Sequence, residues 1–130
     1  MTATSVNIAV VDDDPSVRKA LVRLFDNTPY RPKAYASAGE FLANLAAEFP
    51  QCLIVDFHMP RMTGAELQTH LAKNNIRIPT IVITGNDEPG KREQCLAAGA
   101  RFYLQKPVRR AALLEAIGSI VGGRRVGRPS

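Results

Sequence analysis

Acidic residues that could bind a metal ion follow two apolar stretches of this chain. Asp12 and Asp13 come directly after the β-branched run Val6–Val11, and Asp56 follows the continuous apolar run 53–55. Continuous apolar runs of this kind are typical of strands that are covered on both faces. If the two strands lie side by side, three carboxylates meet and repel one another unless a cation lies between them. Mg²⁺, which prefers oxygen ligands and keeps several waters, fits such a site.

A threonine and a lysine stand at the ends of two later apolar stretches, and both can bind phosphoryl oxygens. Thr84 ends the run Thr80–Thr84, and Lys106 follows the run 101–105. A carboxylate beside Mg²⁺ can attack phosphorus to form an acyl phosphate, while an ammonium and a hydroxyl stabilise the transferring group. Gly85 leaves room after the threonine. Because the sequence contains no glycine-rich phosphate loop, we expect the phosphoryl donor to be another molecule.

Helix start signals lie between these stretches. Three pairs of residues carry them: Asp14 with Pro15, Ser37 with Glu40, and Thr63 with Glu66. The first pair is typical of an N-cap followed by proline at the first helical position, and the other two have the spacing of capping boxes. The first helix is expected to end near Asp26, followed by a turn-rich connection over 27–32 and a short strand over 33–36. A fourth, weak helix is expected around Leu96.

Strand and helix signals alternate five times along the chain, which predicts an α/β fold with a parallel sheet and helices on both faces. Right-handed crossovers leave few topologies. The commonest is the flavodoxin-like, doubly wound (βα)5 sandwich with strand order 2-1-3-4-5. In that order the polar residues above lie at the carboxyl edge of the sheet. The three acids lie at the switch point between strands 1 and 3, where such sheets bind ligands.

Composition sets further bounds. The chain has 130 residues, enough for one domain, and a net charge of +5 to which Arg124, Arg125 and Arg128 contribute three. We expect a domain over 1–121 and a flexible basic tail or linker over 122–130. Cys52 and Cys95 are expected to be reduced thiols. Since the sequence shows neither a signal peptide nor an apolar run long enough to span a membrane, we expect a cytoplasmic protein.

Taken together, these elements resemble the receiver domain of two-component response regulators, a CheY-like domain, over about residues 6–121. The matching elements are the acidic pair 12–13, Asp56 with Met59-Pro60 and Gly64, Thr84-Gly85, and Lys106-Pro107. None of these elements is specific alone, but their order and their places at strand ends make the resemblance strong. The stretch 55–64 looks most like receivers of the FixJ type.

The resemblance implies a role for each residue. Asp56 is the phosphoacceptor, and Thr84 and Lys106 bind phosphoryl oxygens. Mg²⁺ is bound by the side chains of Asp13 and Asp56 and by the backbone carbonyl of His58, with Asp12 contacting it mostly through water. The peptide bond before Pro107 is cis. Tyr103 is the aromatic switch residue, which turns inward into the space that Thr84 leaves after phosphorylation. The His58 side chain itself is expected to face solvent.

The implied function is signalling rather than enzymatic turnover. A sensor histidine kinase donates the phosphoryl group. The face formed by the helix around Leu96, the strand over 101–105 and a last helix that carries Leu113 to Val121 passes the signal to an output domain or a downstream protein. Phosphorylation-dependent homodimers through that face are implied as well. The chain is either a stand-alone receiver or the N-terminal part of a transcriptional regulator. We expect no membrane contact, and nucleic-acid binding only through an output domain outside this chain.

One enzymatic alternative remains open from the sequence, a phosphohydrolase of the haloacid-dehalogenase type. Asp12 and Asp14 would be its nucleophile and acid, with Thr84 and Lys106 in its second and third motifs. Against this alternative, no acidic pair follows Lys106 to hold the metal. It also leaves Asp56 and the Met59-Pro60 pair unexplained.

Overall fold

The computed structural model of the chain describes residues 5–126, with side chains described up to residue 122. Within this range, parallel strands form one sheet in the order β2-β1-β3-β4-β5. The strands are β1 Val6–Val11, β2 Tyr30–Tyr35, β3 Cys52–Asp56, β4 Thr80–Thr84 and β5 Phe102–Gln105. The helices are α1 Pro15–Arg23, α2 Ala38–Asn44, α3 Gly64–Lys73, α4 Lys91–Ala97 and α5 Arg110–Val126. The predicted fold class and strand order are confirmed.

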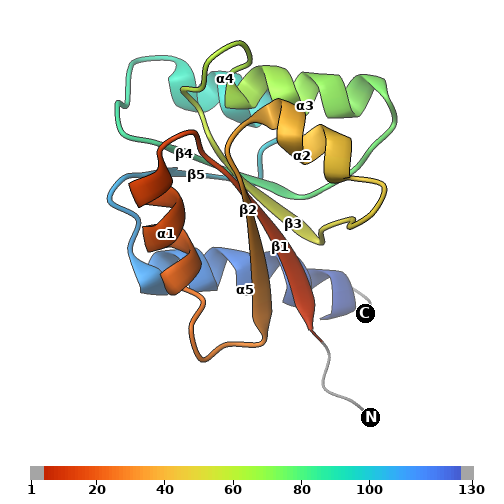
Figure 1. The fold of residues 1–130 in the computed structure, drawn as a ribbon. Coiled ribbons are helices and arrows are strands. Elements are labelled where there is room, and N and C mark those ends of the chain that lie inside the picture. Colours follow the sequence, from red (N-terminus) through yellow and green to blue (C-terminus); the bar gives the residue numbers. More distant parts are fainter. Residues whose placement is uncertain (1–4, 127–130) are drawn as a thin grey trace.

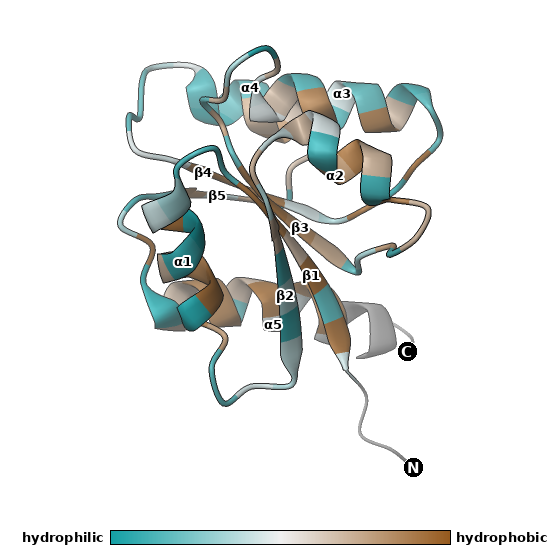
Figure 2. Cartoon of the chain, viewed as in Figure 1, coloured by the Kyte–Doolittle hydropathy of each residue, from teal (hydrophilic) through white to brown (hydrophobic). Residues whose placement is uncertain are grey.

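Helices cover both faces of the sheet, with α1 and α5 on one face and α2, α3 and α4 on the other (Figure 1). An apolar cluster that includes Phe41 and Leu67 fills the space under α2 to α4. A second cluster, which includes Leu21 and Ile117, lies under α1 and α5. Every residue of β3 and β4 is buried, and Figure 2 shows the central strands as apolar. Two covered faces explain why these strands are continuous apolar runs rather than alternating ones.

The strand register brings the polar residues to one edge of the sheet. Val11 pairs with Val55, so Asp12 emerges beside Asp56. Asp56 in turn pairs with Ile83, directly before Thr84, and Thr84 pairs with Gln105, directly before Lys106. The site residues therefore lie together because the parallel strands that carry them end at the same edge of the sheet. This is the carboxyl edge, as predicted.

The predicted helix starts are present with one difference in detail. The Asp14 side chain accepts a hydrogen bond from Ser16 N at 2.9 Å and caps α1. Thr63 and Glu66 form a complete capping box before α3. Before α2, the Ser37 hydroxyl accepts from Glu40 N, but the Glu40 carboxylate accepts from Ala36 N. The capping box predicted there is therefore displaced by one residue.

The second strand starts earlier than predicted. It includes Tyr30, Arg31 and Pro32, for which the sequence predicts a turn-rich connection. β2 lies at the edge of the sheet and pairs with β1 alone. A proline, which lacks an N–H group, is tolerated in an edge strand because one side of the strand has no neighbour to bond.

Two further boundaries differ from the prediction. The helix α1 ends at Arg23, and tighter i to i−3 hydrogen bonds carry the chain through to Asp26. The last helix continues to Val126 instead of ending at Val121, so the first part of the predicted tail is helical. Residues 127–130 of that tail lie outside the described residues. In α4, Leu96 is exposed while Lys91 and Cys95 are buried.

Both cysteines are buried and free, and burial raises the pKa of each thiol. Within the part of the chain that the structure describes, no helix is long and apolar enough to cross a membrane.

Candidate phosphoryl and metal site

Three carboxylates meet at the switch point between β1 and β3. Oxygen atoms of Asp12, Asp13 and Asp56 lie within 4.8 Å of one another, in an arrangement that could hold a metal ion. Asp12 is 0% exposed and Asp56 is 4% exposed, whereas Asp13 is open to solvent. The sequence predicted this cluster correctly because the two strands that carry it end side by side.

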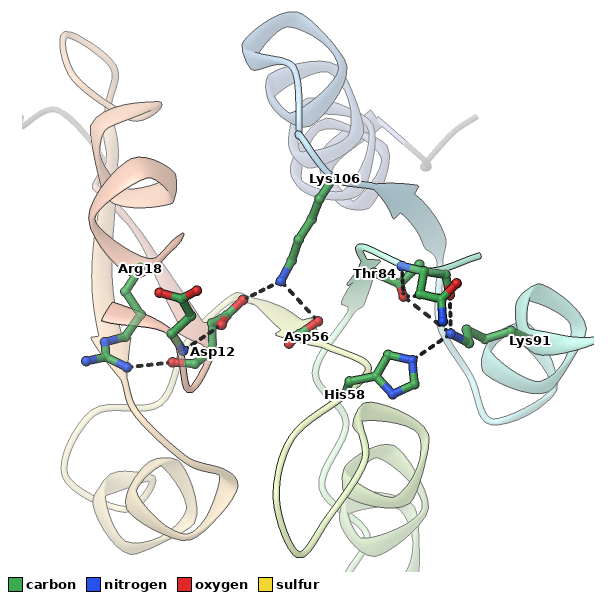
Figure 3. Close-up of polar contacts among 9 residues, drawn as sticks. Asp12, Arg18, Asp56, His58, Thr84, Lys91 and Lys106 are labelled. Atoms are coloured by element: carbon green, nitrogen blue, oxygen red, sulfur yellow. Dashed lines mark hydrogen bonds and ion pairs between the residues drawn. The ribbon is translucent and has the colours of Figure 1, made fainter. Parts of the chain in front are cut away.

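Lys106 bridges the two buried acids. Its Nζ lies 3.1 Å from Asp12 Oδ2 and 3.3 Å from Asp56 Oδ1 (Figure 3). Although burial works against its charge, the two carboxylates raise the pKa of Lys106. Burial, together with the negative charge of Asp12, raises the pKa of Asp56 despite the ammonium. One lysine therefore does not fully offset the combined effect of burial and repulsion on the Asp56 carboxylate.

The donor set fits a hard divalent cation. Asp12 Oδ2 is buried and accepts no well-formed hydrogen bond among the described residues, although the Lys106 ammonium is its ion-pair partner. Oδ1 of the same residue is already bound by Asp14 N at 2.9 Å. A buried carboxylate oxygen without a well-formed hydrogen bond, beside an acid whose pKa is raised, favours the binding of a cation at this site. Oxygen-only ligands with open space toward solvent at Asp13 suit Mg²⁺ with bound waters.

Thr84 ends β4 with its hydroxyl turned into its own loop. The side chain is 0% exposed. Its Oγ1 lies 3.2 Å from both Asn86 N, from which it accepts, and Asn86 O, to which it donates. In this arrangement the hydroxyl is occupied by the backbone that follows β4, so binding a phosphoryl oxygen requires it to exchange partners.

Lys91 is a site residue that sequence reasoning missed. It is the first residue of α4, is 4% exposed, and its Nζ lies 2.7 Å from His58 Nε2 and 3.5 Å from Thr84 Oγ1 (Figure 3). Its charged neighbours in sequence predict a solvated helix face. The available signal is its spacing of four from Cys95, which puts both residues on the buried face of α4.

His58 and Tyr103 both differ in part from expectation. The His58 side chain is exposed, as predicted, but its ring is bound to Lys91 rather than free. Tyr103 is 7% exposed, and its hydroxyl donates to Asp87 Oδ1 at 2.7 Å. The inward rotation predicted for this ring therefore starts from a side chain that is already buried. The cis bond between Lys106 and Pro107 is present as predicted.

The haloacid-dehalogenase alternative is not supported. Asp14, its required acid, is exposed and is engaged as the cap of α1, where its carboxylate binds both the amide and the hydroxyl of Ser16. These bonds lower the pKa of Asp14, which makes it a poor proton donor at neutral pH.

Comparison with known proteins shows the family of the chain. The family model of the response regulator receiver domain matches residues 8–118, and the chain belongs to this family. Nodulation protein W of Bradyrhizobium diazoefficiens is 36% identical over 115 residues, which cover 88% of this chain and 51% of that protein. Transcriptional regulatory protein FixJ of Rhizobium meliloti is 34% identical over 114 residues, which cover 88% of this chain and 56% of that protein.

Solved structures show the same fold. The crystal structure of FixJ-N has a TM-score of 0.83 and 32% identity, covering 92% of this chain and 96% of that one. A CheY-like receiver from Methanospirillum hungatei JF-1 has a TM-score of 0.84 and 30% identity, covering 95% of this chain and 100% of that one. The protein is thus a receiver domain of a two-component system. The chain spans about half the length of the curated relatives named above.

Proposed function

We propose that this receiver accepts a phosphoryl group on Asp56 from a sensor histidine kinase and responds by rearranging the face formed by α4, β5 and α5. The observation that carries the proposal is the placement of Lys106 between the buried carboxylates of Asp12 and Asp56. The Asp56 carboxylate lies beside the Lys106 ammonium and beside two further acids that could hold a cation. These are the groups that phosphoryl transfer needs.

In the proposed step, a carboxylate oxygen of Asp56 attacks phosphorus on a phosphohistidine of the kinase. An O–P bond forms while the P–N bond breaks, and its electron pair stays on the leaving imidazole nitrogen. Asp12, Asp13, Asp56 and the His58 carbonyl would hold Mg²⁺, which when bound neutralises charge on the transferring group. Lys106 is close enough to Asp56 to move its ammonium from the carboxylate to a phosphoryl oxygen. The Thr84 hydroxyl supplies a further donor once it leaves Asn86.

The proposed response follows from the added charge. A phosphoryl group brings about −1.5 to −2 charges at pH 7. It attracts the Thr84 hydroxyl and with it the loop after β4, which also holds the hydroxyl of Tyr103 through Asp87. We propose that this displacement changes the α4–β5–α5 face and its contacts with an output domain, a downstream protein or a second copy of the chain. Residues 1–121 would be the receiver, and 122–130, the first of which continue α5, would be the linker.

Intact mass after incubation with acetyl phosphate and Mg²⁺ tests the proposal. Wild type and Asp14→Asn should each gain one phosphoryl group, because asparagine also caps helices, whereas Asp56→Asn should gain none. Chelation of divalent ions should abolish the gain. If the wild type gains no phosphoryl group from either acetyl phosphate or a phosphorylated histidine kinase, the proposal is overturned. A gain of one phosphoryl group by Asp56→Asn would overturn the assignment of Asp56 as the acceptor.

A further inference from the structure

The ammonium of Lys91 is buried at the start of α4, on the opposite side of Thr84 and His58 from Lys106 (Figure 3). Burying a lysine is costly unless its donors are satisfied. Its Nζ contacts His58 Nε2 at 2.7 Å, the Asn86 carbonyl oxygen, Thr84 Oγ1 at 3.5 Å and Glu88 Oε1 at 3.5 Å. An ammonium has three N–H donors and no acceptor, so these four contacts share three protons, and His58 Nε2 and the Asn86 carbonyl oxygen can only accept from it.

These contacts involve the two residues that border Asp56 on the α4 side. Thr84 ends the strand beside β3, and His58 comes two residues after Asp56. The donated hydrogen bonds hold both side chains toward α4. The Thr84 hydroxyl is further tied to Asn86, whose carbonyl also binds Lys91. A hydroxyl held in this way must give up these partners before it can bind a phosphoryl oxygen.

We propose that Lys91 is a positioning residue that stabilises the unphosphorylated arrangement of Thr84 and His58 and must release Thr84 when Asp56 is phosphorylated. This inference rests on the proposed function. Because Lys91 is the first residue of α4, its release displaces the N-terminal end of that helix. Lys91 thereby connects the phosphoryl site directly to the face that carries the response.

If the role of Lys91 were purely structural, a substitution that keeps its packing would leave binding of a phosphoryl mimic unchanged. The Lys91 ammonium also lies 4.9 Å from the centre of the Phe57 ring, so in a purely structural role the side chain would only fill space between α4 and this ring. Methionine is similar in length and apolar volume but donates no hydrogen bond. Lys91→Met therefore keeps the packing and removes the donor. Lys73→Met, at the exposed end of α3, removes the same charge away from the site.

Titration with beryllofluoride and Mg²⁺, followed by amide NMR shifts, tests the proposal. Lys91→Met should bind the phosphoryl mimic roughly three- to tenfold more tightly than wild type, a change on the scale of one net hydrogen bond. Lys73→Met should bind it like the wild type. Equal or weaker binding by Lys91→Met, relative to Lys73→Met, overturns the proposal.

A second measurement does not depend on phosphorylation. A hydrogen bond from Lys91 requires His58 Nε2 to be the unprotonated acceptor, which fixes the proton on Nδ1. Nitrogen-15 shifts of the imidazole should show this tautomer in the wild type and its loss in Lys91→Met, with the exposed His70 as the unchanged internal reference. A proton on Nε2 in the wild type overturns the inference. Wild-type protein that shows the tautomer but binds no mimic refutes the proposed function instead.

Discussion

The hydroxyl of Tyr103 donates a hydrogen bond of 2.7 Å to Oδ1 of Asp87. The other carboxylate oxygen of Asp87 accepts from Gln105 Nε2 at 3.0 Å. β5 is thus tied at two points to the loop that follows Thr84. Any movement of this loop toward a phosphoryl group therefore has to break or carry along both bonds, which makes Asp87 a side-chain link between the site and β5 in addition to the strand pairing of Thr84 with Gln105.

Asp87→Asn should lower the pKa of Tyr103 part of the way toward its ordinary value. Burial raises this pKa first, and the hydrogen bond and charge of Asp87 raise it further. Asparagine keeps an acceptor but removes the negative charge that opposes ionisation of the phenol. Ultraviolet titration of the tyrosines measures the change, and Tyr103→Phe identifies which curve belongs to Tyr103. An unchanged titration of Tyr103 would show that Asp87 has no electrostatic effect on it.

Asp56→Asn should stabilise the metal-free protein at neutral pH by about 1 kcal/mol, an ordinary size for one substitution. The pKa of Asp56 is raised in the folded state, so the folded state holds this proton more tightly than the unfolded chain. The resulting penalty is absent below the unfolded pKa, appears as the pH rises through the folded pKa, and is complete above it.

Urea unfolding in the absence of divalent ions measures this difference. The gain from Asp56→Asn should be full at pH 7 and should shrink toward zero near about pH 4, the ordinary range of a carboxyl group. Saturating Mg²⁺ should reduce the difference in unfolding free energy between Asp56→Asn and the wild type at pH 7, because it stabilises the wild type preferentially. A substitution that destabilises the protein at pH 7 would contradict this prediction.

Lys106→Gln should tighten Mg²⁺ binding severalfold. The ammonium is the cation that at present offsets Asp12 and Asp56, so removing it leaves a more negative site for a metal ion. Calorimetric titration with magnesium chloride measures the affinity. Lys33→Gln is the matched control, because Lys33 forms its 3.1 Å ion pair with Glu48 on the surface. Weaker binding by Lys106→Gln than by Lys33→Gln would contradict the expectation.

Gly64→Ala should destabilise the protein by about 1–3 kcal/mol, the usual range for overpacking. A Cβ at this position would lie 3.0 Å from the Asp56 carbonyl oxygen and 3.3 Å from Phe57 Cα, and backbone atoms cannot move aside cheaply. The strain should displace the end of β3 and weaken Mg²⁺ binding as well.

Gly39→Ala in α2 is the natural control for Gly64→Ala. Its Cβ would have only Ser37 Oγ nearby, at 3.8 Å, and alanine is the better helix former by roughly 1 kcal/mol. Thermal unfolding should therefore show opposite signs for the two substitutions. Similar changes in stability from both substitutions would mean that the space beside Gly64 does not require glycine.

Much of the fold and the acidic site could be predicted from the sequence, because the signals involved are local or periodic. Asp14 and Thr63 cap their helices through atoms two or three residues away. Continuous apolar runs mark the buried strands, and polar residues at their ends meet once the strands pair in parallel. This logic predicts that Asp12, Asp56 and Lys106 lie together, as the two ion pairs of Lys106 show.

Other features depended on contacts between segments far apart in the chain. The start of β2 at Tyr30 is set by pairing with Val6, not by its own sequence, which contains Pro32. Lys91 lies in a run of charged residues, yet it is buried in the folded chain and its ammonium contacts His58, 33 residues away.

By itself, then, the sequence determined which residues stand at the strand ends and hence the chemistry of the site. Only the tertiary structure decided which partners those residues hold at rest: Thr84 in its loop beside Lys91, and Tyr103 against Asp87. The physical reason is that backbone periodicity is encoded in neighbouring residues, whereas the partner of a side-chain donor depends on how separate elements pack. Local patterns do not specify that geometry.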